Sequence, residues 1–178
     1  MFKMRSRVAL ALAALASALV SAPVAQAADL SDARFHITAN IASYHYEAAQ
    51  NFEETNPGLG FGFTLPISAS GAEIGAEIGR YRNSVGGWSN YATASYDTPV
   101  AQTRSAALRL GVFSGMAHYD DASSKFAGGG VPMVGDWVVV AGAQATVRID
   151  EDYDIRVRAL PAGKAAKVLF TLQVAHRF

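Results

Sequence analysis

The segment at the C-terminal end of the chain alternates between apolar and mixed positions. From Val168 to Phe178 every second residue is apolar, except His176, and the residues between them are smaller or more polar. Period-two alternation places successive side chains on opposite faces of a β-strand. A strand with one apolar face and a terminal aromatic residue is typical of the last strand of an outer-membrane β-barrel. A half-buried strand of a soluble sandwich gives the same alternation. The N-terminal sequence distinguishes the membrane barrel from the soluble sandwich.

The N-terminus has the three parts of a secretory signal peptide: a basic region, an apolar run and a small-residue cleavage site. These are Lys3, Arg5 and Arg7, then residues 8–20, then Ala25-Gln26-Ala27. We expect cleavage after Ala27, with Ala28 as the alternative, so that 1–27 is removed and 28–178 forms one domain. No other run approaches the roughly 18 apolar residues of a transmembrane helix. A membrane form of this chain would therefore cross with strands.

Composition and charge narrow the function classes. The chain has no cysteine and a formal net charge of zero. A neutral chain gives no electrostatic case for nucleic acid binding. No residue pattern indicates a cofactor or a metal, and we expect neither.

Eight segments with strand character follow one another between residue 34 and the C-terminus. They are 34–46, 57–68, 72–84, 88–98, 105–119, 136–149, 153–162 and 166–178. Short turns follow the second, fourth and sixth segments, whereas longer or more polar loops follow the first and fifth. Bacterial outer-membrane barrels have short periplasmic turns and longer external loops. The sequence therefore predicts an all-β fold, an eight-stranded antiparallel up-and-down transmembrane barrel, monomeric and located in the bacterial outer membrane.

The predicted lumen has a charged periplasmic half. A barrel of eight strands is only wide enough to be filled by side chains or to hold one small ligand, which argues against a general porin. The inward candidates near the periplasmic end carry both signs of charge: His36, Glu73, Glu77, Asp97, Arg109, Arg148, Asp154, Arg156 and Arg177, with Arg158 nearer mid-height. Buried charges persist when they are paired. We therefore expect an ion-paired floor.

The predicted external half of the lumen is mostly uncharged and contains several glycines. Its inward residues would either fill the lumen or leave a pocket for a hydrocarbon chain that enters from the outer leaflet. The candidates for such an acyl pocket are Tyr44, Gly60, Gly62, Tyr81, Phe113, Gly115, Val140 and Leu169.

Polar groups suited to acyl transfer lie at the predicted external strand ends. Acyl transfer needs a base near a hydroxyl and a group that orients the base or holds the oxyanion. His45 ends the first segment and Asn83-Ser84 ends the third, and only one strand separates these two segments. The alternative is that they are solvated loop residues, because external loops are rich in such side chains.

These residues lie in short motifs whose order resembles the lipid A palmitoyltransferase family of outer-membrane barrels. The motifs are Ser43-Tyr44-His45-Tyr46, Asn56-Pro57-Gly58-Leu59-Gly60-Phe61-Gly62 and Tyr81-Arg82-Asn83-Ser84-Val85-Gly86-Gly87-Trp88, continued through 108–115, 128–132 and 159–161. The resemblance implies an enzyme that moves an acyl chain from a phospholipid to lipid A at the outer leaflet. It implies that His45 and Ser84 are the essential histidine and serine.

The chain departs from the family at two places. Asn83 stands where the family has an aspartate, and an amide offers only neutral hydrogen bonds to a neighbouring base. The amphipathic helix that precedes the first strand in the family is reduced here to 28–33. Both departures favour a catalytically silent barrel over an acyltransferase.

Three prolines fall at the ends of predicted strands. Pro57, Pro132 and Pro161 each lack a backbone N–H and so remove one hydrogen bond from the strand ladder. The resemblance implies that such gaps are lateral openings for lipid. The alternative is that the prolines only end strands.

Three functional hypotheses follow. The first is an acyltransferase whose partners are phospholipid and lipid A, the second a catalytically silent structural or interaction barrel, and the third a small-solute transporter. In each case the terminal Phe178 resembles the C-terminal signal that the barrel assembly machinery recognises.

Overall fold

The computed structural model describes residues 29–120, 122, 126 and 129–178, so the predicted signal peptide lies outside the described residues. A short 3-10 turn, η1 (Leu30–Asp32), precedes the strands. The strands are β1 (Arg34–Tyr46), β2 (Thr55–Pro66), β3 (Glu73–Arg82), β4 (Trp88–Gln102), β5 (Ala106–His118), β6 (Met133–Val134), β7 (Trp137–Ile149), β8 (Tyr153–Pro161) and β9 (Val168–Arg177). The eight long strands match the predicted segments to within a few residues, and only the short β6 was not predicted.

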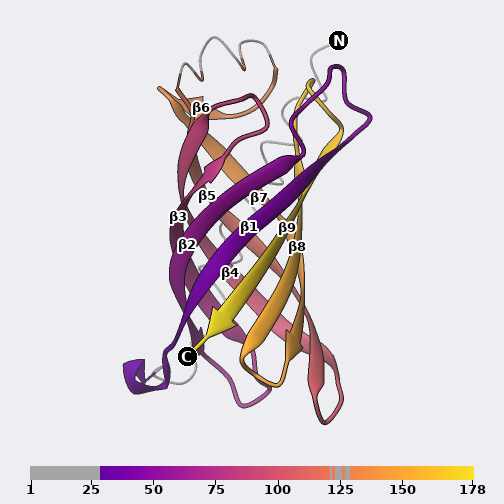
Figure 1. The fold of residues 1–178 in the computed structure, drawn as a ribbon. Helices are drawn as coiled ribbons and strands as arrows, with labels where there is room; N and C mark the ends of the chain where they lie inside the picture. Colours follow the sequence, from indigo (N-terminus) through magenta and orange to yellow (C-terminus); the bar gives the residue numbers. More distant parts are fainter. Residues whose placement is uncertain (1–28, 121, 123–125, 127–128) are drawn as a thin grey trace, which may run out of the picture.

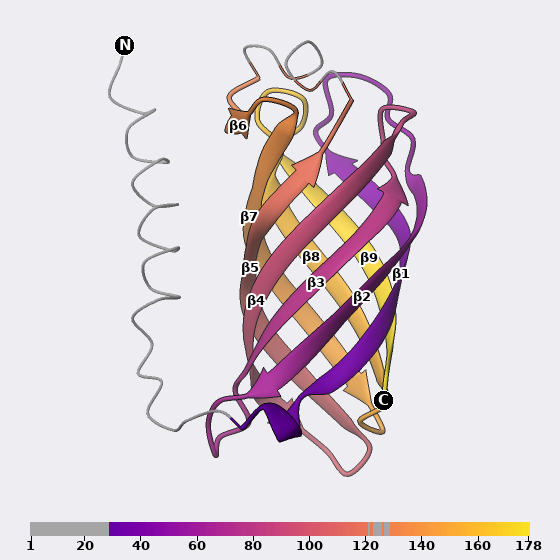
Figure 2. The ribbon, with the colours of Figure 1, turned by 90° about the vertical axis from the view of Figure 1, so that its left-hand side faces the viewer.

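The sheet closes on itself. Each strand from β1 to β5 pairs antiparallel with the next, β1 also pairs with β9, and β9, β8 and β7 follow in order until β7 pairs with β5. β6 pairs only with the first residues of β7, so the closed barrel has eight strands (Figures 1 and 2). The predicted up-and-down barrel, with its last strand closing on its first, is confirmed.

The two ends of the barrel differ. Both described ends of the chain and the connections 67–72, 103–105 and 150–152 lie at one end, which we call the turn end (Figure 1). The connections after β1, β3, β5 and β8 lie at the opposite end, which we call the loop end. In an outer-membrane barrel the turn end faces the periplasm. Among the described residues no helix is both long and apolar enough to cross a membrane.

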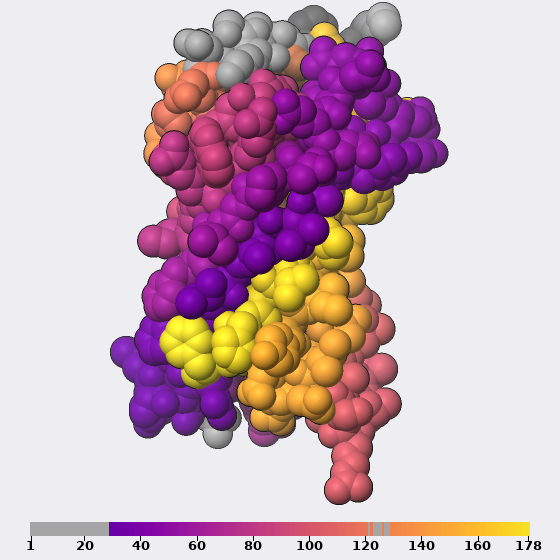
Figure 3. All heavy atoms as spheres, in the orientation of Figure 1, coloured from indigo at the N-terminus to yellow at the C-terminus, as the bar shows by residue number. Residues whose placement is uncertain are grey.

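The outward face of the barrel is apolar. Ile37, Leu59, Ile78, Leu110 and Val157 are all exposed on strands whose alternate residues are buried inside. Exposed aromatic side chains lie towards both ends of the barrel: Tyr44, Tyr46, Trp88 and Trp137 towards the loop end, and Phe35, Tyr153 and Phe178 towards the turn end. Figure 3 shows one side of this surface, where β9 lies between β1 and β8. An apolar belt between aromatic girdles is the outer surface of a barrel built for a membrane.

One inward assignment was wrong because β1 contains a bulge. Between the pairs Asn40–Gln173 and Ala42–Leu172, β1 advances by two residues whereas β9 advances by one. Ile41 is therefore the extra residue of the bulge. A bulge shifts every later side chain to the opposite face. Tyr44 therefore faces outward and is 54% exposed, whereas Ser43 and His45 are buried on the lumen side.

Candidate functional site

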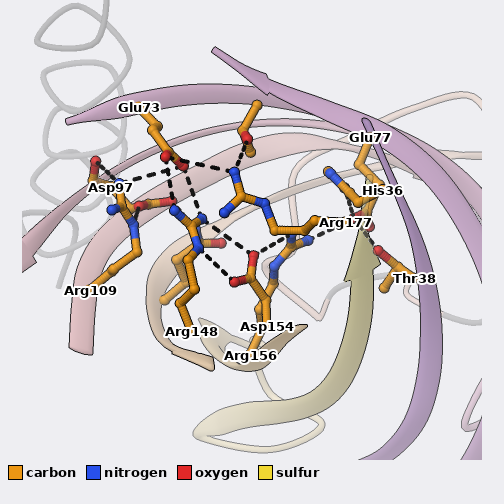
Figure 4. Close-up of polar contacts among 12 residues, drawn as sticks. His36, Thr38, Glu73, Glu77, Asp97, Arg109, Arg148, Asp154, Arg156 and Arg177 are labelled. Carbon is orange, nitrogen blue, oxygen red and sulfur yellow. Dashed lines mark hydrogen bonds and ion pairs between the residues drawn. The ribbon is translucent and has the colours of Figure 1, made fainter. Parts of the chain in front are cut away.

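The lumen near the turn end is filled by ion pairs. Arg148 donates two hydrogen bonds to Glu73, at 2.8 and 3.0 Å, and a third to Asp154 at 2.9 Å. Asp154 also accepts from Arg156 at 3.2 Å. Because β3, β7 and β8 supply these residues, the pairs bridge the lumen from wall to wall (Figure 4).

Glu77 is the second centre of this network. Its Oε2 accepts from Thr38 at 2.7 Å and from Arg156 at 2.8 Å, and lies 3.0 Å from His36 Nε2. Its Oε1 accepts from the Tyr91 hydroxyl at 2.8 Å. Side chains from three other strands, β1, β4 and β8, therefore converge on one β3 carboxylate that is 4% exposed.

The predicted charged floor is confirmed. Asp97 accepts from Arg109 and, at 3.2 Å, from Gln144, and Arg177 lies 3.8 Å from Glu73. Every residue of the predicted floor is buried: His36, Glu73, Glu77, Asp97, Arg109, Arg148, Asp154, Arg156, Arg158 and Arg177.

Above the floor the lumen contains a cavity of about 90 Å³. Its lower wall is polar and includes Arg158, Asn40 and Gln173, whereas Phe113 and Leu160 belong to its apolar wall. It extends to the loop end, where Ser84 and Asn56 line it. At about 10–15 Å³ for each water-sized position, the cavity holds six to nine such positions.

Only half of the proposed acyl-pocket residues line this cavity. Tyr81, Phe113, Val140 and Leu169 do so. The space at the predicted glycines is occupied by neighbours. A Cβ on Gly60 would collide with the Tyr91 hydroxyl, one on Gly62 with the Ala76 carbonyl oxygen and His36 Nε2, and one on Gly115 with the Ala92 carbonyl oxygen. The glycines make room for the backbone and the inward side chains of the wall rather than for a hydrocarbon chain.

His45 lies at the loop end of β1 and points inward. Its ring stacks on Phe52 of the β1–β2 loop, with ring centroids 4.0 Å apart, and is 8% exposed. Its Nδ1 has no hydrogen-bond partner among the described residues. The predicted base is thus held by an aromatic contact.

Asn83 has a structural role in the β3–β4 turn. Its Oδ1 accepts from the backbone N–H groups of Val85, at 3.1 Å, and Gly87, at 2.9 Å. Its Nδ2 donates to Ser89 Oγ at 3.0 Å, and the side chain is 1% exposed. The amide therefore uses both of its polar atoms to hold the turn. This gives an independent reason for asparagine at this position, because an ionised aspartate could accept the two backbone N–H groups but could not donate to Ser89.

Ser84 lies on the same rim as His45, and the β1–β2 loop runs between them. The backbone N–H of Glu53, next to Phe52, donates to the Ser84 carbonyl at 3.0 Å. In the part of the chain that the structure describes, no hydrogen bond joins the Ser84 side chain to His45 or Asn83. The structure brings the three predicted residues to one rim without assembling them into a hydrogen-bonded set.

The same loop is fixed to β3 by an exposed ion pair. Arg82 donates to Glu53 at 2.8 and 3.1 Å, and this hydrogen bonding holds the pKa of the Glu53 carboxyl below its usual value. Exposed pairs of this kind contribute little to overall stability. The pair instead orders the loop that carries Phe52 over His45.

The ladder between β7 and β8 ends early. The pairing stops at Ala143 and Ala159, although β8 continues to Pro161 and remains paired with β9. Val140 and Leu160, on either side of this unpaired seam, both line the cavity. Pro57, in contrast, lies inside β2, at the gap between the Asn40–Gly58 and Ala42–Thr55 pairs.

Several lumen residues were missed at the level of sequence. Ser43, Asn40, Thr171 and Gln173 line the cavity, and none was assigned to the predicted external pocket. Thr171 and Gln173 are polar residues of the terminal alternating segment, so the alternation itself indicated that they face the lumen. Ser43 could not be found, because the bulge at Ile41 gives no signal in the hydrophobic pattern.

Comparison with known proteins gives similarity at the level of fold. No protein-family model and no curated protein matches the chain. Among solved structures, the outer membrane protein Ail of Yersinia pestis in a phospholipid bilayer nanodisc is similar, with 10% identity, 82% of this chain and 99% of that chain covered, and a TM-score of 0.44. The crystal structure of Ail, the attachment invasion locus protein of Yersinia pestis, is also similar, with 13% identity, 83% of this chain and 99% of that chain covered, and a TM-score of 0.44. An identity this low transfers no residue role.

Proposed function

We propose that this chain is an integral outer-membrane barrel that neither conducts solutes nor carries out acyl transfer, and that acts as a structural or interaction protein through its loop end. The membrane location is supported by the apolar outward belt, the exposed aromatic residues towards both ends and the short turns at one end. The absence of conduction is supported by the ion-paired floor.

The non-catalytic assignment rests on the contacts of the predicted catalytic residues, which are structural. Asn83 uses its amide to hold a turn, and the His45 ring is stacked on Phe52. A general base has to reach the proton that it removes, at about 2.6–3.2 Å, whereas His45 is only 8% exposed and Phe52 covers one face of its ring. A cavity of 90 Å³ with Arg158 in its wall also suits a long hydrocarbon chain badly.

Acyl transfer is the second candidate, and one observation favours it. The unpaired seam between β7 and β8 lies beside the cavity, between Val140 and Leu160. A gap in a ladder is where a lipid chain could enter a closed barrel from the side. Rotation of Phe52 away from His45 would then be needed to free the imidazole.

Mass spectrometry of lipid A separates the two candidates. Lipid A would be prepared from cells that lack the protein and from cells that express the wild-type chain, His45→Ala or His176→Ala. His176 is exposed on the outward face, so its replacement is the matched control. Outer-membrane fractionation of each strain would verify that the barrel is present.

We expect the same lipid A acyl pattern in all four strains, with the protein recovered in the outer membrane of the three strains that express it. An additional acyl chain that appears with the wild-type and His176→Ala proteins but not with His45→Ala would establish the acyltransferase and overturn this proposal. Recovery in a soluble fraction would overturn the membrane assignment.

A further inference from the structure

We propose that the lumen cavity binds a small carboxylate with an apolar body, which enters from the loop end and pairs with Arg158. The inference rests on the proposed non-conducting barrel, because a closed floor makes the cavity a site and not a passage. It adds a ligand class that the proposed structural role does not require.

Arg158 differs from the other lumen arginines. Arg109, Arg148, Arg156 and Arg177 each lie within 4.0 Å of a carboxylate oxygen, whereas among the described residues Arg158 has no such partner. Its Nε donates to Gln144 at 3.2 Å and its guanidinium lies 4.7 Å from the centre of the Phe113 ring. The side chain is 5% exposed and lines the cavity.

A buried guanidinium without an anionic partner is unfavourable unless something compensates for it. The cation–π contact with Phe113 offsets part of this cost. The four lumen carboxylates are already engaged by other groups: Glu73, Glu77, Asp97 and Asp154. Among the described residues the lumen thus carries five guanidinium groups and four carboxylates, and the guanidinium without a carboxylate within 4.0 Å, Arg158, lines the cavity.

Unpaired hydroxyl groups in the same cavity are a second, independent observation. Ser43 Oγ and Thr93 Oγ1 are buried, line the cavity and have no hydrogen-bond partner among the described residues. Ser43 and Arg158 both pair in register with Thr171, so they flank the same residue of β9 from β1 and β8. Buried polar groups are rarely left unsatisfied. Two hydroxyl donors and a guanidinium around one space match the acceptors of a carboxylate.

The rest of the wall selects an apolar body. Phe113, Val140, Leu160 and Leu169 line the same cavity, and the Leu160–Leu169 pair lies nearer the loop end than Arg158 does. Six to nine water-sized positions correspond to roughly as many non-hydrogen atoms, which is the range from butyrate to benzoate. The carboxylate would lie at Arg158 and the apolar body would point towards the loop end.

Binding of benzoate to the full barrel in detergent micelles tests this inference. Titrations followed by NMR of the arginine side-chain N–H signals would use benzoate, its neutral analogue benzyl alcohol, and inorganic phosphate. The variants are Arg158→Gln, which removes the charge, and Val140→Phe, which keeps the charge and fills the cavity. Arg80→Gln is the matched control, because Arg80 lies on the outward face over Trp88.

We expect saturable shifts of the Arg158 signal with benzoate and none with benzyl alcohol or phosphate. The Arg158→Gln variant should bind benzoate at least about tenfold more weakly than wild type, because it loses a charge-assisted hydrogen bond. Val140→Phe should also weaken binding, and Arg80→Gln should bind as wild type does. Arg158→Gln should unfold no more readily than wild type, because it removes an unpaired buried charge.

Absence of saturable benzoate binding to the wild-type barrel would overturn the inference, as would equal binding by Arg158→Gln. Stronger binding of phosphate than of benzoate would also overturn it, because the site would then recognise inorganic anions. None of these results affects the proposed non-conducting barrel, which conductance and lipid A measurements test separately.

Discussion

Replacing Glu77 by glutamine tests whether the ion-paired floor stabilises the barrel. Glutamine preserves the volume of the side chain but replaces one acceptor oxygen with an NH₂ group. In the wild-type protein Oε2 accepts from Thr38 and Arg156 and Oε1 accepts from Tyr91. An amide in this position must therefore turn its NH₂ group towards at least one donor.

The size of the effect follows from the partners that remain. Breaking a buried ion pair by removing one charge costs about 3–5 kcal/mol. Arg156 keeps its contact with Asp154 at 3.2 Å, so we expect the lower end of this range. A loss of about 3 kcal/mol corresponds to a roughly hundredfold change in the unfolding equilibrium constant.

Urea titrations of the barrel in lipid vesicles measure this loss, with the fluorescence of Trp88 and Trp137 as the signal, since both lie on the outward face. Glu53→Gln is the matched control, because Glu53 forms an exposed pair with Arg82 in a loop. We expect Glu53→Gln to unfold as wild type does and Glu77→Gln to unfold at a clearly lower urea concentration. Equal midpoints for the two variants would refute the argument that the floor is a stabilising network.

Three further predictions concern the loop end and the C-terminus. Asn83→Ala should lower the free energy of unfolding by about 1–3 kcal/mol, because the turn loses its acceptor; the same urea titration measures this. The Glu53 contact should be present at neutral pH and be lost as the pH falls through the lowered pKa, and the Glu53 pKa measured by carboxyl NMR should rise in Arg82→Gln. Deleting Phe178, whose backbone exchanges two hydrogen bonds with Phe35, should reduce the fraction of heat-modifiable, folded barrel recovered from the outer membrane; normal recovery would count against a role in assembly.

The fold could be predicted from the sequence because each long strand carries its own period-two signal. In β9 the apolar residues alternate with smaller or more polar ones, which predicts one outward and one lumen face. The structure confirms both faces. The charged floor could be predicted for the same reason, since Glu73, Glu77, Arg148 and Arg156 lie at alternate positions of strands without bulges.

The loop end could be predicted less well, because the sequence does not show where a ladder slips or which side chain fills a gap. The bulge at Ile41 reversed the facing of Tyr44 and brought Ser43 into the lumen. Gly60 and Gly62 were candidates for an acyl pocket, whereas Tyr91 and His36 occupy the space beside them. The excess of one lumen guanidinium was visible in the sequence, but which arginine stays unpaired depends on distances that only the structure gives.

Conductance across a planar lipid bilayer tests the central claim most directly. We expect the folded wild-type barrel to insert without ohmic current steps, because Arg148, Glu73, Asp154 and Arg156 bridge its lumen. A variant in which Arg148 and Glu73 are both replaced by alanine should keep the strand pairing of the barrel and produce small current steps. Stable current steps from the wild-type protein, equal to those of the double variant, would contradict the account of a closed, non-conducting barrel.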